Sequence, residues 1–143
     1  MRVRDAVEAD AQAIAALSGQ PVDATREVVH DRSVRVAVPG EEDVDADAGP
    51  DLDEPIAYVA FDARRGRVHL TGFAGEEAAL RRLLEEPARF ADREGMAVEA
   101  IVDRDDEARR SIVEAAGFED VGSGPRFDGA ETVRYRLPAT EQG

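Results

Sequence analysis

The sequence contains no cysteine and no lysine, and these absences exclude several kinds of chemistry. Without cysteine the chain cannot form disulfides, thiolate zinc sites or a cysteine nucleophile. Only two histidines are present, His30 and His69, so a histidine-rich metal site is not expected either. No apolar run approaches the length of a membrane-spanning helix, and no signal-peptide pattern precedes Arg2 and Arg4. These features predict a cytoplasmic protein with no bound metal and no membrane contact.

The charge of the chain is strongly acidic. All 18 basic residues are arginines, and 32 acidic residues give a net charge of −14. The acids are spread along the chain rather than gathered in one tail, which favours a salt-adapted surface over the alternative, a site for a basic partner. Concentrated salt makes their repulsion tolerable, because the Debye length falls to about 3 Å at 1 M. No nucleic-acid partner is expected, since phosphate binding requires the opposite charge.

The length and the hydrophobic pattern predict one α/β domain over residues 1–143. Short apolar or alternating stretches indicate strands at 1–6, 33–38, 56–61, 67–73, 97–102, 118–121 and 132–137. Helical spacing indicates one helix that ends at Gly19, a second from an N-cap at Asp23 to about Arg32, and a third over 76–95, which Pro87 must interrupt. Residues 62–66 join two of the strands as an antiparallel hairpin.

Residues 97–118 show the clearest local pattern. A short apolar run, Ala97–Val102, is followed by acids that can cap a helix and suit its first turn. Apolar residues then recur at helical spacing up to Gly117, where a glycine can adopt the left-handed conformation that ends a helix. Phe118 is expected to be buried at the start of the next strand. The strand–helix–strand order over 67–102 predicts that strands 67–73 and 97–102 are parallel.

An acidic segment at 41–54 holds eight acids in 14 residues and is expected to be a hairpin loop without regular structure. Most of an EF-hand ligand set is present in it, at Asp43, Asp45, Asp47, Asp51 and Glu54. However, Ala48 stands where that motif requires glycine, and the flanking segments are predicted strands, so calcium binding is not favoured. The tail, residues 138–143, is expected to fray.

The predicted order is strand, two helices, three strands, helix, strand, helix and two strands. This order resembles that of the Gcn5-related N-acetyltransferase (GNAT) superfamily along nearly the whole chain. The opening MRVRDA, the strand and helix that close on Gly117 and Phe118, and the segments GFEDVG and VRYRL resemble the family's own segments at the same places. The resemblance implies a mixed, mostly antiparallel sheet flanked by helices. It also implies acetyl transfer from acetyl-CoA to a small-molecule or peptide amine.

The family holds the acetyl-CoA pyrophosphate on backbone N–H groups in the turn after the fourth strand, where an open helix N-terminus attracts an anion. The resemblance places this turn at residues 73–80 and assigns cofactor binding to Phe73, Gly75, Glu76 and Ala78. The family's basic residue and paired glycines are missing, since Gly75, Ala78 and Leu80 stand at those three positions. Glu76 and Glu77 also bring negative charge to the turn. Acetyl-CoA binding is therefore expected to be weak or lost.

The second landmark of the family is also altered. Counting back from Gly117 puts Val113 where many members have a tyrosine that protonates the leaving thiolate, and Asp106 where the family has asparagine. Asp106 is interpreted more simply as an acid that stabilises its own helix. His69 and Glu99 are candidate bases, but each is also explained as a structural residue, and Arg126 could meet an acidic substrate or offset nearby acids. No catalytic residue is assigned.

Two functions are therefore compatible with the sequence. One is an N-acetyltransferase of the GNAT type with a divergent cofactor turn. The other is a non-catalytic GNAT-fold module that binds a small ligand or a protein. A fold alone does not choose between them.

The salt-adapted interpretation makes a thermodynamic prediction. The melting temperature should rise as KCl is increased into the molar range, because salt screens the mutual repulsion of the 32 acids. Thermal unfolding followed by circular dichroism at several KCl concentrations measures this dependence. A melting temperature that is flat or falls with KCl contradicts salt adaptation.

Overall fold

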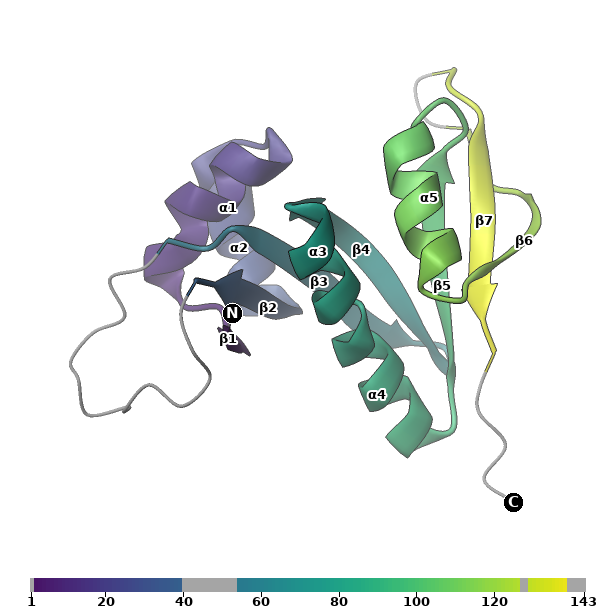
Figure 1. Cartoon of the computed structure of the whole chain (residues 1–143), viewed down its shortest axis with the longest axis horizontal. Coiled ribbons are helices and arrows are strands. Elements are labelled where there is room, and N and C mark those ends of the chain that lie inside the picture. Colours follow the sequence, from purple (N-terminus) through teal and green to yellow (C-terminus); the bar gives the residue numbers. More distant parts are fainter. Residues whose placement is uncertain (1, 40–53, 127–128, 139–143) are drawn as a thin grey trace. The chain divides into compact units, whose positions relative to one another are not determined.

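The computed structural model describes residues 2–39, 54–126 and 129–138 (Figure 1). Its contacts divide the chain into two compact units. The first comprises Met1–Ala60 and Gly72–Leu83, and the second comprises Phe61–Thr71 and Leu84–Gly143. The expectation of one domain over residues 1–143 stays a prediction.

The described residues form strands and helices in the order that the sequence predicts, with a short 3₁₀ helix added near the start and the third helix split in two. The elements are β1 (Arg2–Asp5), η1 (Glu8–Asp10), α1 (Ala11–Ser18), α2 (Val22–Asp31), β2 (Ser33–Val38), β3 (Ala57–Arg64), β4 (Arg67–Gly75), α3 (Glu77–Leu83), α4 (Glu85–Glu94), β5 (Ala97–Asp103), α5 (Glu107–Ala115), β6 (Glu119–Ser123) and β7 (Thr132–Leu137). The strand order is β1-β2-β3-β4-β5-β7-β6. This confirms the predicted mixed, mostly antiparallel sheet.

The first unit is built on the alternation of β2. Its valines 34, 36 and 38 are buried, while β1 pairs antiparallel along its edge. Ile14 of α1 packs into the same core, and Gly19 ends that helix in the left-handed conformation with φ 75°. Asp10 is buried at the start of α1, and it accepts hydrogen bonds from Arg4 at 2.7 and 3.0 Å. The buried carboxylate is thereby neutralised, as burial of a charge requires.

The hairpin of β3 and β4 is tighter than the sequence predicts. Only Arg65 and Gly66 separate the strands, and both have positive φ, 54° and 77°. Two such residues define a type I′ turn, whose twist matches that of the paired strands. The charged residues at 62–64 had suggested a loop, but side chains at the end of a strand can remain in solvent.

The crossover from β4 to β5 has the predicted geometry. Pro87 lies in the first turn of α4, where its missing N–H disrupts no helical hydrogen bond. Strand β5 pairs parallel with β4, with Arg67 opposite Ala97 and Leu70 opposite Ala100. The parallel pair predicted for the strand–helix–strand segment is confirmed.

The helix after β5 is capped at both ends as predicted. Asp106 is the N-cap of α5, and its side chain accepts a hydrogen bond from the Arg109 backbone N–H at 3.1 Å. Burial alone would raise the pKa of the Asp106 carboxyl, but hydrogen bonds from the side chain and backbone of Arg109 outweigh burial and hold this pKa below its ordinary value of 3.8. Gly117 follows the helix with φ 97°, and Phe118 is buried.

Two local expectations are wrong. Asp23 is not the N-cap of α2, because that helix begins at Val22 after Pro21. Proline suits the start of a helix because it has no N–H that needs a partner. Strand β6 begins at Glu119 rather than at Phe118 and extends to Ser123. The acidic segment, apart from Glu54, and the tail beyond Pro138 lie outside the described residues.

Replacement of Asp106 by alanine should lower the free energy of unfolding by about 1 kcal/mol near neutral pH, the usual effect of losing an N-cap. Because the folded pKa lies below the unfolded value, this stabilisation is present above about pH 4 and is lost as the pH falls through the lowered folded pKa. Urea denaturation as a function of pH measures the difference. Asp105→Ala, at the exposed residue before the cap, is the control and should cost little at any pH. An equal loss in both variants would refute the capping role.

Candidate functional site

The end of β4 and the start of α3 hold the four residues that the family resemblance assigns to cofactor binding. Phe73 is buried, whereas Gly75, Glu76 and Ala78 are exposed. Gly75 has φ 129°, and a Cβ built on it would overlap the carbonyl oxygen of Ile56 and the Cα of Ala57. The Glu76 N–H donates to the same Ile56 oxygen at 3.1 Å. Glycine is therefore required here by the approach of the chain's own backbone.

The first turn of α3 presents backbone donors. Within the part of the chain that the structure describes, the N–H groups of Glu77 and Ala78 have no acceptor, and both residues are exposed. Of the predicted residues, only Ala78 contributes a free N–H, while Glu77 contributes one that the sequence did not suggest. The Glu77 carboxylate pairs with Arg81 at 3.1 Å, and Leu80 is buried. The turn can thus offer two donors to an anion.

The structure explains the positions of three further residues, Val113, Arg126 and Tyr58. Val113, which the resemblance aligns with the family's tyrosine, is fully buried on α5. Arg126 is exposed and pairs with Glu131 at 3.3 Å, which supports its role in offsetting an acid. Tyr58 is buried in the core of the first unit.

Tyr135 on β7 forms two side-chain hydrogen bonds to α5. Its hydroxyl accepts a hydrogen bond from Arg110 Nε at 3.0 Å and donates one to Glu114 at 2.6 Å. Burial, followed by the hydrogen bond to Glu114, raises the pKa of this phenol above 10.0. The phenol therefore stays protonated at neutral pH and links β7 to α5.

Glu99 is a buried carboxylate shared by two arginines. It is 6% exposed and lies 2.5 Å from Arg67 Nη1 on β4 and 3.3 Å from Arg136 Nη2 on β7. Both cations bind the same oxygen, Oε2. The geometry supports the structural interpretation of Glu99, because its charge already has two partners.

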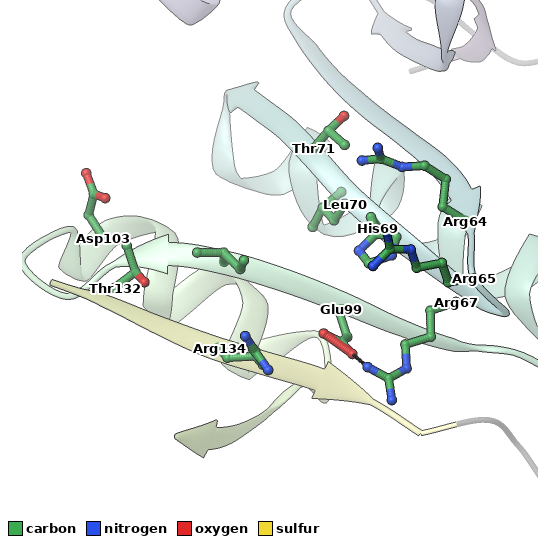
Figure 2. Close-up of a pocket in the computed structure, with 11 residues that line it drawn as sticks. Arg64, Arg65, Arg67, His69, Leu70, Thr71, Glu99, Asp103, Thr132 and Arg134 are labelled. Carbon is green, nitrogen blue, oxygen red and sulfur yellow. Dashed lines mark hydrogen bonds and ion pairs between the residues drawn. The ribbon is translucent and has the colours of Figure 1, made fainter. Parts of the chain in front are cut away.

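A cavity of about 740 Å³ lies on the second unit, on the face of β4, β5 and β7 that includes Glu99. Figure 2 shows Arg64, Arg65 and Arg67 at one end and Asp103 with Thr132 at the other. His69, half-buried, is on the same lining. Neighbouring residues of a strand point to opposite faces of the sheet. Arg134 of β7 lines the cavity, whereas the next residue, Tyr135, is hydrogen-bonded to α5. Helix α5 therefore packs on the face opposite the cavity.

The sequence predicted no cavity here, although two of its lining residues were candidate bases. His69 and Glu99 were considered, but Arg65, Ile101 and Arg134 were not, although all of them line it. The alternation in TVRYRL already places Arg134 and Arg136 on one face of the last strand. The alternation does not show which strand pairs with the last one, and that pairing brings Arg134 opposite Ile101.

None of the described residues form a cluster of three metal-ligating side chains, and the predicted calcium alternative falls mostly on residues outside them. Among the helices described, none is long and apolar enough to cross a membrane.

No protein-family model and no curated protein matches the sequence. Solved structures do match it. The ribosomal-protein-S18-alanine N-acetyltransferase of Escherichia coli superposes with a TM-score of 0.72 at 14% identity, covering 99% of this chain and 95% of that one. YncA of Salmonella typhimurium, solved with its cofactor acetyl-CoA, gives 0.69 at 18% identity, covering 98% and 94%. A GNAT-family acetyltransferase of Streptococcus pneumoniae gives 0.67 at 13% identity, covering 96% and 98%.

The chain therefore has the fold of the GNAT superfamily of acetyltransferases, as the resemblance implied. The similarity extends over nearly the full length of each protein compared. At these identities it establishes the fold, and the activity has to be argued from the residues.

The role of Gly75 can be tested against a second glycine. Gly75→Ala should destabilise the protein by roughly 3 kcal/mol or more, because it adds both a strained φ and an overlap with the backbone of residues 56–57. Gly95→Ala is the control, since Gly95 also has positive φ, 69°, but has open space around its missing Cβ. It should cost about 1 kcal/mol. Chemical denaturation compares the two, and equal losses would show that the close approach at Gly75 is unimportant.

Proposed function

We propose that the chain binds acetyl-CoA at the β4–α3 turn, through Phe73, Gly75, Glu76 and Ala78, and transfers the acetyl group slowly to a small-molecule or peptide amine. The observation that carries this function is the pair of exposed N–H groups at Glu77 and Ala78, directly after the backbone approach at Gly75. Donors at the start of a helix suit a phosphate group. The fold supports the proposal, since YncA was solved with acetyl-CoA. We place the reaction in the cytoplasm, where acetyl-CoA is available.

The same turn explains why binding should be weak. The Glu76 N–H is already used by Ile56, so one donor is withdrawn from any ligand. The exposed Glu76 carboxylate opposes an anion, whereas the charge of Glu77 is partly offset by Arg81. Molar salt would screen this repulsion but would not restore the missing donor.

Slow transfer follows from the groups available for proton transfer. Acetyl transfer requires an acid for the leaving thiolate and a base for the amine, and such groups typically contribute about 10²–10⁴-fold. Val113 supplies no proton at the position that the family resemblance assigns to the acid. Glu99 is held by two arginines and is a poor candidate for the base.

The apolar side chain of Val113 and the ion pairs of Glu99 also favour a second candidate function. This is a GNAT-fold module that binds acetyl-CoA or another small ligand without catalysis. The two functions differ in one measurable respect. An enzyme releases free CoA in the presence of an amine pool, whereas a binding module does not.

Calorimetric titration of acetyl-CoA tests the binding site. The wild type should bind more weakly than micromolar, and Glu76→Gln should strengthen binding about two- to fivefold at low salt because it removes an exposed like charge. Glu94→Gln makes the same change in net charge at the end of α4 and should have little effect. The gain should shrink in molar KCl.

Two alanines at matched positions test the N–H donors in the same assay. Ala78 and Ala108 are each the second residue of their helix, α3 and α5, and both are exposed. Proline is tolerated in a first helical turn, so Ala78→Pro removes a donor with limited strain. Loss of acetyl-CoA binding in Ala78→Pro, with binding retained in Ala108→Pro, is the expected result. Equal behaviour of the two variants would show that the α3 turn is not the binding site.

A further inference from the structure

The cavity on β4, β5 and β7 has a composition opposite to that of the chain. Four of the 18 arginines line it, at 64, 65, 67 and 134, but only two of the 32 acids, Glu99 and Asp103. Its volume of about 740 Å³ is within the usual range for small-molecule sites. A basic cavity on a protein of net charge −14 is a specific feature rather than an average property of the surface.

Its charges are not all matched. Arg64 pairs with Asp62 at 3.3 Å, and Glu99 is shared by Arg67 and by Arg136 beyond the lining. Among the residues that the structure describes, Arg65 and Arg134 have neither an ion pair nor a side-chain hydrogen bond. Asp103 is the acid that opposes them. The cavity therefore keeps a net positive charge.

Arg134 shows the clearest need for a ligand. Its Nε is buried without any hydrogen-bond partner in the described structure, and an unpaired buried donor is destabilising. Arg134 lies opposite Ile101 in the register of β5 and β7 and two residues away from the level of Asp103. A carboxylate can accept two parallel hydrogen bonds from one guanidinium, which satisfies such a donor.

The wall next to Arg134 is apolar. Ile101 lines the cavity, and its side chain is 42% exposed. Exposed apolar surface inside a cavity is stabilised when a ligand covers it. A bare inorganic anion would leave this surface in water.

We propose that the cavity binds a small aliphatic carboxylate, with its carboxylate on the Arg134 guanidinium and its hydrocarbon chain against Ile101. Arg65 at the hairpin turn adds positive charge at the same cavity and favours entry of the anion. The residues of this site differ from those proposed for acetyl-CoA at the β4–α3 turn.

Hexanoate, hexylamine and inorganic phosphate are the probes, titrated into the whole chain at fixed ionic strength. Arginine ¹⁵N labelling allows the Nε–H signal of Arg134 to be followed, and the signal is identified as the one missing from Arg134→Gln. Hexanoate should shift this signal and bind at least about tenfold more tightly than hexylamine. Phosphate should bind more weakly than hexanoate, because it leaves the apolar wall uncovered.

Three variants test the named contacts. Arg134→Gln should weaken hexanoate binding about tenfold, and Arg65→Gln should weaken it by a smaller factor. Ile101→Ser should weaken hexanoate binding severalfold but leave acetate binding unchanged. Arg126→Gln, outside the cavity, is the control for loss of one positive charge and should have no effect. Arg65→Gln keeps the test valid if Arg134→Gln does not fold, since Arg65 is an exposed turn residue.

The proposal is overturned if hexanoate binds no better than hexylamine or phosphate, or if no cavity variant weakens it. Acetyl-CoA titration of the same samples separates this result from the proposed function. Loss of hexanoate binding with acetyl-CoA binding intact rejects only the cavity site, and the reverse outcome rejects only the cofactor turn.

Discussion

The second unit depends on one buried charge and the two cations that neutralise it. A carboxylate without partners is strongly destabilised away from water, so Glu99 can be buried on β5 only because Arg67 and Arg136 reach it from the strands on either side. Removal of either arginine would leave the buried acid less well compensated. The pair therefore fixes which residues of β4 and β7 face the same side as Glu99. The cavity residues are on that side.

The arginines on the cavity face of the sheet differ in their roles. Arg67 and Arg136 serve the fold, because their charge is used by Glu99. Arg134 lies two residues before Arg136 on β7. It has no such partner within the described residues and remains available to a ligand. Since no lysine is present, all of these cations have the planar, multiply donating guanidinium that suits carboxylates.

Much of the fold could be predicted from local sequence. Several strands and helices show apolar residues at the expected spacing, and glycines mark where two of the helices end. Ser33–Val38 and Thr132–Leu137 match their predicted strands, and Gly19 and Gly117 end helices as expected. The predicted start of α2 was wrong because both Pro21 and Asp23 are common at the beginning of a helix. The sequence does not show at which of the two the helical backbone begins. The cavity could not be predicted, since Ile101 and Arg134 are neighbours only through strand pairing. Gly75 was assigned to cofactor binding, and the structure gives it a different requirement, because residues 56–57 leave no space for a Cβ there.

The division of the chain into two units has a consequence for its synthesis and its dissection. Neither unit is one continuous length of polypeptide, because β3 and β4 each begin in one unit and end in the other. The first unit cannot be completed on the ribosome until residue 83 has emerged, and by then residues 61–71 of the second unit have already been made. A gene cut at any single point would leave at least one unit without one of its segments. Neither unit can therefore be produced on its own as one uninterrupted stretch of the sequence.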